Sequence, residues 1–113
     1  MNAAGANFAF RRELESDVVT HAAVIAVDSK EQAQMEAGDL IEPFKEDPSG
    51  WGRVCELAEI VSGKLPGRSG AEQITLFKSL GIATWDIAVA SRVFARAETQ
   101  GLGRHVPLGE VRQ

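Results

Sequence analysis

The chain has 113 residues, of which 44% are hydrophobic and 25% charged, and its formal net charge at pH 7 is −4. This composition is typical of a soluble globular protein with one modest core, and it excludes collagen-like, coiled-coil and wholly disordered chains. The acidic balance gives no electrostatic basis for binding nucleic acid, and no apolar run approaches the roughly 20 residues that span a bilayer, so no membrane partner is expected. The single cysteine, Cys55, cannot form an internal disulfide, and we expect the chain in the cytoplasm.

The first part of the chain predicts a loop, a short helix and a buried strand. Small residues dominate 2–8, which indicates a loop or the end of a strand. Residues 13–22 favour one short amphipathic helix. The apolar run 23–27 shows no alternation of polar and apolar positions, which is typical of a strand buried on both faces of a parallel sheet.

A second helix is predicted directly after this strand, over 30–37. Ser29 is placed as its N-cap, Gln32 completes a capping-box pattern, and Gly38 is placed to end the helix. Residues 42–50 contain two prolines and a glycine, so they are expected to form a loop.

The second half predicts two further helices and one strand. Helical spacing of apolar residues predicts a helix over 51–61, on the positions Trp51, Val54, Cys55, Ala58 and Val61. Gly63 is placed to end it, 64–70 has the composition of a linker, and 74–77 indicates a strand. The last element is a helix over 84–100, with an apolar stripe made by Ala83, Ile87, Ala90, Phe94 and Ala97.

The order of these elements predicts an α/β fold, because strands alternate with helices. Two strands are well supported, and a third is a candidate at the start of the chain. Two or three parallel strands make a small sheet to cover on both faces, so the fold looks incomplete as a self-contained domain.

Several residues that could carry chemistry fit structural roles better. His21 and His105 lie far apart in the sequence and in no metal-binding spacing, so no metal site is expected. Cys55 falls on the apolar stripe of a predicted helix, which favours a buried thiol over a nucleophile. Residues 63–70 resemble a phosphate loop only superficially, because the G-x-x-x-x-G-K-[ST] order is absent and Pro66 lacks an N–H.

The carboxylates are likewise expected to be structural or solvated. Two pairs could each share a helix face, and both are expected to lie in solvent rather than to act as acid and base: Glu13 with Asp17, and Glu56 with Glu59. Asp28 is expected to end the strand 23–27, and no chemistry is assigned to it.

Two segments do not fit a purely structural interpretation. Residues 5–7 form a flexible turn that is followed by Phe8 and by two arginines. Residues 77–81 place the polar pair Lys78-Ser79 directly after a strand that looks buried. In open α/β sheets, ligands bind just beyond the carboxyl ends of the strands, so this pair could face a ligand.

A series of short motifs carries a family resemblance. In chain order they are NAAGAN (2–7), REL (12–14), VDSKEQA (27–33), EAGDL (36–40), ELAEI (56–60), GK with PGR (63–68) and ITLFKSLG (74–81). Their order and spacing resemble the ornithine cyclodeaminase/mu-crystallin family, to about residue 103. Members of that family are NAD(P)-dependent enzymes and binding proteins, among them ornithine cyclodeaminases, alanine dehydrogenases, reductases of cyclic imino acids and mu-crystallin.

The resemblance implies a fold and a domain organisation. Family members join a Rossmann domain to a domain for substrate binding and dimerisation, and this sequence resembles only their last third or so. It implies the C-terminal part of a Rossmann-type NAD(P)-binding domain over 1–82, with few parallel strands and flanking helices. Over 83–113 it implies a long helix and a tail that return toward the absent substrate and dimerisation domain. The glycine-rich turn G-x-G-x-x-G is missing, and the resemblance implies a truncated gene product, an internal start or a deliberate fragment.

The resemblance also implies site residues. The loop beside the nicotinamide would be formed by Gly5, Ala6 and Asn7, and the second wall by Lys78, Ser79, Leu80 and Gly81. In cyclodeaminases an aspartate at the position of Asn7 shuttles protons, and an asparagine cannot titrate in that role. This favours a reductase or dehydrogenase. Asn7 and Lys78 are the catalytic candidates, as groups that help to position the reacting atoms.

Two functions remain open from the sequence. The first is the C-terminal part of an amino or imino acid oxidoreductase that uses NAD or NADP, with little dinucleotide binding and no turnover on its own. The second is a non-catalytic interaction or dimerisation module. Its apolar stripe on 84–100 would be covered by a second copy in a homo-oligomer or by a partner domain.

Overall fold

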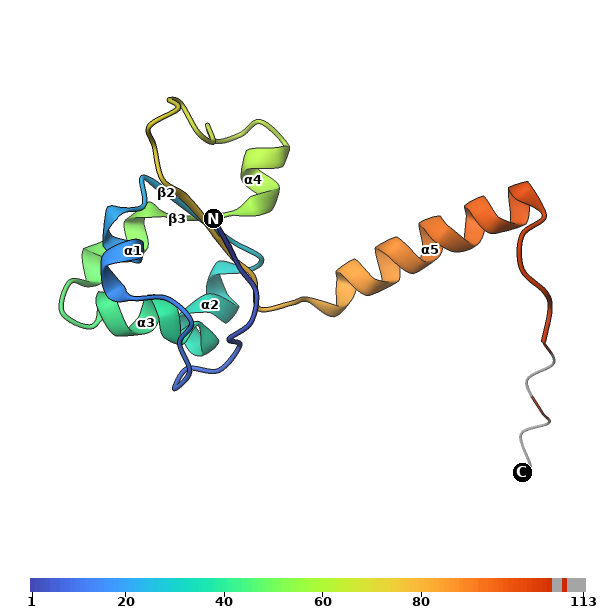
Figure 1. The fold of residues 1–113 in the computed structure, drawn as a ribbon, viewed down its shortest axis with the longest axis horizontal. Helices are drawn as coiled ribbons and strands as arrows, with labels where there is room; N and C mark the ends of the chain where they lie inside the picture. Colours follow the sequence, from blue (N-terminus) through green and yellow to red (C-terminus); the bar gives the residue numbers. More distant parts are fainter. Residues whose placement is uncertain (107–108, 110–113) are drawn as a thin grey trace. The chain divides into compact units, whose positions relative to one another are not determined.

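The computed structural model describes residues 1–106 and 109. Internal contacts divide the chain into two units, Met1–Ile82 and Ala83–Gln113. The first unit holds the sheet and most of the helices (Figure 1).

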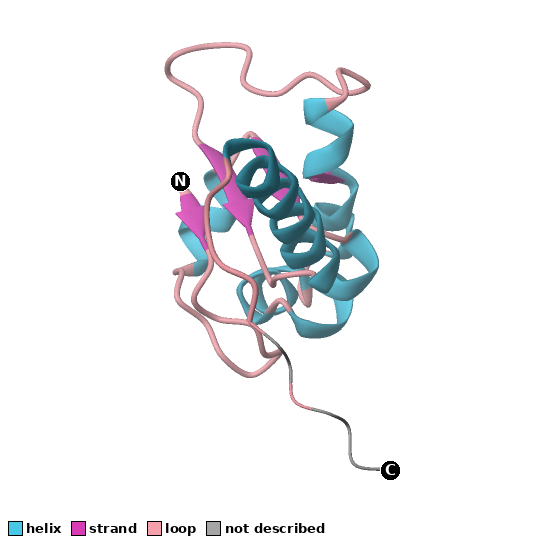
Figure 2. Ribbon diagram, turned by 90° about the vertical axis from the view of Figure 1, so that its right-hand side faces the viewer, coloured by secondary structure: helices cyan, strands magenta, loops and turns pink. Residues whose placement is uncertain are grey.

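Four parallel strands form the sheet of the first unit, in the order β1-β4-β2-β3 (Figure 2). The strands are β1 (Asn2–Ala3), β2 (Val24–Val27), β3 (Val54–Glu56) and β4 (Thr75–Lys78). Ile25 of β2 lies in register with Leu76 on one side and with Val54 on the other. Residues in register point to the same face of a sheet, so these three side chains enter one core. The predicted α/β class with few parallel strands is confirmed.

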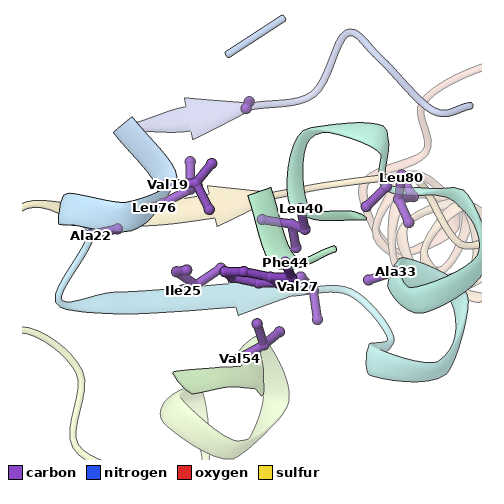
Figure 3. Packing of buried hydrophobic residues seen from close by; sticks show 12 residues of the cluster. Val19, Ala22, Ile25, Val27, Ala33, Leu40, Phe44, Val54, Leu76 and Leu80 are labelled. Carbon is purple, nitrogen blue, oxygen red and sulfur yellow. The ribbon is translucent and has the colours of Figure 1, made fainter. Parts of the chain in front are cut away.

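Three short helices cover that face of the sheet (Figure 1). They are α1 (Ser16–His21), α2 (Lys30–Glu36) and α3 (Gly38–Phe44), whereas α4 (Leu57–Val61) lies on the other side. The core in Figure 3 joins the strands to the helices through buried side chains, among them Val19, Ile25, Val27, Leu40, Phe44 and Leu76. Each fully buried side chain of this size contributes about 1.5–3 kcal/mol, which is what holds such short elements in place.

The start of α2 is as predicted, but its capping box is only half formed. Ser29 Oγ accepts a hydrogen bond from the Gln32 backbone N–H at 3.3 Å. The Gln32 side chain donates to Glu36 Oε2 at 2.9 Å, one turn further along the helix, instead of reaching back to Ser29.

The predicted role of Gly38 is wrong. It does not end α2 in a left-handed conformation; it is the first residue of α3. A side chain at this position would collide with the loop before α1, because the carbonyl oxygens of Phe8, Ala9 and Arg11 stand where a Cβ atom would be. Gly38 is therefore required for the close approach of two backbone segments.

The predicted loop over 42–50 is also partly helical. Residues up to Phe44 belong to α3, and a 3₁₀ turn, η1 (Pro48–Arg53), follows. Pro43 lies near the end of α3, where little of the helix remains for it to interrupt, and the buried side chains of Leu40 and Phe44 hold the helix on the core.

The predicted helix over 51–61 is wrong in its first half. Val54–Glu56 is strand β3 and only Leu57–Val61 is helical. A strand of three residues is too short to show an alternating pattern, so the apolar spacing matched a helix by coincidence. Cys55 accordingly lies on a strand, half-buried, with its Sγ 3.6 Å from the carbonyl oxygen of Ile25. Gly63, at φ +76°, follows α4 and ends it as predicted.

The second unit contains one long helix, α5 (Ala83–Gln100), close to the predicted range. None of its residues is buried: Ile87 is 68% exposed and Phe94 is 62% exposed. Within residues 1–106 and 109, no helix is long and apolar enough to cross a membrane. The predicted tail extends over 107–108 and 110–113, which lie outside the described residues.

Candidate functional site

Three strands of the sheet end side by side at one edge. Lys78, the last residue of β4, is in register with Ala3 at the end of β1 and with Val27 at the end of β2. Because the strands are parallel, the segments that follow them all leave from this edge: 4–7, the residue Asp28, and 79–81. We call this group of segments the carboxyl edge.

Lys78 holds two carboxylates under the carboxyl edge. Its side chain is fully buried, and Nζ lies 2.7 Å from Glu13 Oε1 and 2.9 Å from Asp39 Oδ2. The Asp39 side chain is also fully buried. A buried ammonium needs such partners, because an unpaired charge in the interior is strongly unfavourable.

Glu13 ties this ion cluster to the loop after β1. Its Oε1 accepts hydrogen bonds from the backbone N–H groups of Gly5, at 2.8 Å, and of Ala6, at 3.2 Å. The hydrogen bond from Lys78 lowers the pKa of Glu13, partial burial opposes this, and the two backbone N–H groups lower the pKa further. The ionised carboxylate therefore fixes the loop in position.

Asp39 connects the same cluster to the segment before α1. Its Oδ1 accepts from the backbone N–H groups of Glu13, at 2.7 Å, and Leu14, at 2.9 Å. Asp39 lies in the first turn of α3, directly after Gly38, so the tight packing at Gly38 brings the carboxylate to these N–H groups.

Asp28 fixes the loop after β4 in the same way. Its Oδ2 accepts from Ser79 Oγ at 2.9 Å and from the backbone N–H groups of Leu80 and Gly81, at 2.6 and 2.8 Å. Gly81 has φ +81°, a conformation that favours glycine. Asp28 is only 8% exposed. Its second carboxylate oxygen, Oδ1, is buried and has no hydrogen-bond partner among the described residues.

The structure brings all the predicted site residues to the carboxyl edge. Gly5, Ala6 and Asn7 follow β1, and Lys78, Ser79, Leu80 and Gly81 lie at and after the end of β4. Asn7 is exposed, whereas the Lys78 ammonium is buried beneath the loops. The catalytic and cofactor-binding roles of these residues stay predictions.

Sequence reasoning missed three residues of this site: Glu13, Asp28 and Asp39. Glu13 was expected in solvent, and that prediction is wrong because its carboxylate bonds Lys78 and the 5–6 backbone. The pair Glu56 and Glu59 is not simply solvated either, since both side chains form the capping box of α4. A signal was present for Asp28, a lone acidic residue at the end of a buried strand.

Two further observations concern metal ligands and the single thiol. Within 1–106 and 109, no group of three or more His, Cys, Asp or Glu side chains is arranged to hold a metal ion. The Cys55 thiol lies on β3. Burial raises its pKa most, and the negative charge of nearby Glu59 raises the pKa further. A raised pKa keeps the thiol protonated and therefore weakly nucleophilic at neutral pH.

The parallel sheet of the first unit, with helices on its faces and polar loops at its carboxyl edge, has the architecture of part of a Rossmann-type α/β fold. Residues 1–101 match the profile of the ornithine cyclodeaminase/mu-crystallin family. The chain belongs to that family, and the predicted resemblance is confirmed.

Two individual relatives show how similar the chain is to characterised members of the family. The chain is 40% identical over 107 residues to a Delta(1)-pyrroline-2-carboxylate reductase of Bacillus cereus, covering 94% of this chain and 33% of the relative. It is 38% identical over 94 residues to the ketimine reductase mu-crystallin of Mus musculus, covering 83% of this chain and 27% of the relative. The chain therefore spans between about a quarter and a third of the length of these relatives.

Solved structures give the same fold. The structure of the Thermococcus litoralis Delta(1)-pyrroline-2-carboxylate reductase in complex with NADH and L-proline matches this chain with a TM-score of 0.80 at 40% identity. The match covers 93% of this chain and 32% of the reductase chain. The structure of an archaeal alanine dehydrogenase dimer with bound NAD matches with a TM-score of 0.74 at 31% identity. This match covers 96% of this chain and 33% of the dehydrogenase chain. The Rossmann-type fold class is thereby confirmed.

Proposed function

We propose that residues 1–82 form the nicotinamide side of the NAD(P)-binding domain of an amino or imino acid oxidoreductase. The observation that carries this proposal is the pair of loops 5–7 and 79–81, which stand at the ends of the neighbouring strands β1 and β4. Each loop is held by a carboxylate, Glu13 or Asp28. Two fixed loops at neighbouring strand ends are where a Rossmann-type sheet receives its ligand.

The residues present fit the nicotinamide end of the cofactor and not its pyrophosphate. Backbone N–H groups that hold phosphates in glycine-rich loops are here bonded to carboxylates, at Gly5 and Ala6 and again at Leu80 and Gly81. The nicotinamide ring, which is cationic in the oxidised cofactor and neutral in the reduced one, carries no negative charge and needs no such cradle. When bound, the cofactor supplies the hydride acceptor or donor.

The roles of the two catalytic candidates follow from where they lie. The Asn7 amide is exposed at the carboxyl edge, so we propose that it donates and accepts hydrogen bonds to the reacting groups without changing charge. The Lys78 ammonium is buried, so its part is to hold Glu13 and, through it, the Gly5–Ala6 backbone. Ser79 Oγ donates to Asp28, which orients the second wall.

The substrate class in this proposal is a small amino or imino acid. It is supported by relatives whose names specify pyrroline-2-carboxylate, a ketimine or alanine as substrate, and by the L-proline in the Thermococcus litoralis complex. NAD and NADP are both compatible with the proposal. We further propose that the chain works in the cytoplasm, because its one cysteine forms no disulfide.

These 113 residues on their own are proposed to bind dinucleotide weakly and to turn nothing over, since they contain no G-x-G-x-x-G turn. The test is isothermal titration of the chain with NADH and NADPH, followed by an NADH oxidation assay with cyclic imino acids. Weak binding without turnover agrees with the proposal. A steady oxidation rate that Asn7→Ala abolishes would show that the chain is a complete catalyst.

A second candidate function has its own observation, the exposure of α5. The helix buries none of its residues, and large apolar side chains such as Trp85, Ile87, Val93 and Phe94 are each at least 40% exposed. Such a surface is typical of an association site, either between copies of the chain or with a partner domain. Light scattering across a concentration series tests it: a mass that stays at that of one chain refutes association between copies.

A further inference from the structure

The carboxyl edge holds more negative charge than positive charge. Three carboxylates belong to it, on Glu13, Asp28 and Asp39, and one ammonium, on Lys78, lies between two of them. Asp28 has no cationic partner within hydrogen-bond reach, and one of its oxygens is buried without any hydrogen-bond partner among the described residues. The ion cluster and Asp28 together leave the edge with an excess of two negative charges.

Other charges near this edge do not cancel the excess. Arg12 pairs with Glu15 at 3.8 Å, and the Arg11 guanidinium lies in solvent over the rings of Phe8 and Phe10, 5.2 and 5.8 Å from their centroids. Exposed charges such as these are screened by water and salt far more than buried ones. At the end of β3, the Glu56 carboxylate accepts from the backbone N–H of Lys30, and the formal charges of these two residues cancel.

Hydrogen bonding at the edge reinforces this electrostatic pattern. The N–H groups of Gly5 and Ala6 donate to Glu13, and those of Leu80 and Gly81 donate to Asp28. With these donors already engaged, the loops have few N–H groups left to offer an anion. A ligand at the edge therefore meets loops whose N–H donors are largely engaged, with the excess negative charge lying beneath them.

We propose that the carboxyl edge selects its ligand by charge, and that it binds the cationic pyridinium form of a nicotinamide more tightly than a neutral or an anionic ring of the same shape. The inference rests on the proposed function, because it takes the nicotinamide ring to be the occupant of this edge. The same field favours a positively charged iminium carbon in a substrate beside the ring. Each of the two net charges, acting over about 10 Å at an effective dielectric constant near 20, changes affinity by on the order of tenfold, and screening by water and salt reduces their combined effect toward the same size.

The test uses three small probes that differ in charge but hardly in shape: 1-methylnicotinamide (cation), nicotinamide (neutral) and nicotinate (anion). Each is titrated into the ¹⁵N-labelled chain, and dissociation constants are taken from the amide shifts of residues 5–7 and 79–81. We expect the cation to bind most tightly, the neutral probe less tightly and the anion least, with dissociation constants about tenfold apart at each step. The differences between these dissociation constants should decrease as salt is added.

Two variants connect the charge preference to the edge. Asp28→Asn removes one negative charge while its amide oxygen can still accept from the loop, and it should reduce the cation preference several-fold. Glu72→Gln is the matched control, since Glu72 is exposed in the turn before β4, at the opposite end of that strand, and the substitution removes the same charge. The wild-type order of affinity tests the proposal even where Asp28→Asn does not fold.

Three results would overturn the proposal: nicotinate binding as tightly as 1-methylnicotinamide, no response to any probe, or an equal effect of the two variants. NADH is titrated in parallel to separate this inference from the proposed function. If NADH shifts the amide resonances of residues 5–7 and 79–81 but the affinities of the probes do not follow their charge, only the proposal of charge selection is refuted. If NADH shifts none of these residues either, the proposed function fails with it.

Discussion

Replacing Lys78 by methionine tests whether the buried ion cluster holds the site together. The substitution keeps an unbranched side chain of similar length but removes the ammonium that lies 2.7 Å from Glu13 and 2.9 Å from Asp39. Glu13 is 31% exposed and can recover hydration, whereas Asp39 is fully buried and would keep its charge without a cation. Removing one partner of a buried pair costs about 3–5 kcal/mol, so the free energy of unfolding should fall by that amount.

Lys45→Met provides a matched control for this prediction. Lys45 forms its ion pair with Glu42 on the surface, where both side chains are about half exposed. Surface pairs contribute about 0–1 kcal/mol, so this variant should unfold nearly as the wild type does. Both variants are measured by urea unfolding at pH 7, followed by circular dichroism.

The double variant Lys78→Met/Asp39→Asn separates charge from packing. Asparagine can still accept from the Glu13 and Leu14 N–H groups, but it leaves no buried charge, so part of the lost stability should return. The reasoning is refuted if Lys78→Met costs no more than Lys45→Met. It is also refuted if neutralising Asp39 in the Lys78→Met background lowers stability further.

Three further predictions follow from the packing and the charges. Gly38→Ala should lower the free energy of unfolding in urea by about 1–3 kcal/mol, because the added methyl group meets three carbonyl oxygens. Gly52→Ala is the control and should change it little, because there is open space around Gly52. Equal effects of the two variants would contradict the close approach at Gly38. Because the pKa of Glu13 is lowered in the folded state, its contribution to stability is complete above the ordinary glutamate pKa of about 4.3 and is lost as the pH falls through the folded value. The stability difference between wild type and Glu13→Gln should therefore shrink between pH 6 and pH 3, and a constant difference would refute this assignment. Leu40→Ala should cost about 2–5 kcal/mol by removing a fully buried side chain from α3, and a loss under 1 kcal/mol would contradict its place in the core.

Local signals in the sequence predicted the longer elements well. Strand β2 follows from its continuous apolar run, α2 from the cap at Ser29, and α5 from the regular steps of its apolar stripe. Each of these depends on neighbouring residues alone. The strand β3 could not be found in this way, because three residues carry too little periodicity and only pairing with β2 defines them.

The site divides along the same line. The loops 5–7 and 79–81 could be predicted, because small and polar residues directly after strands are visible in the sequence. The carboxylates that hold these loops could not, since Glu13 meets Lys78 across 65 residues of chain and Asp28 meets Gly81 across 53. Only the parallel order of the strands brings those partners together. Gly38 was misassigned for a similar reason, because its constraint is imposed by carbonyl oxygens from a distant loop.

The central claim is that the nicotinamide ring lies between the loops 5–7 and 79–81. Intermolecular nuclear Overhauser effects between the nicotinamide C4 protons of NADH and the amide protons of the ¹⁵N-labelled chain test it most directly. The account predicts contacts to Asn7 and to at least one residue of 79–81. Contacts instead to the sheet face near Ala26, Arg68 and Phe77, which line a separate cavity, or no contact to the carboxyl edge at saturating NADH, would contradict it.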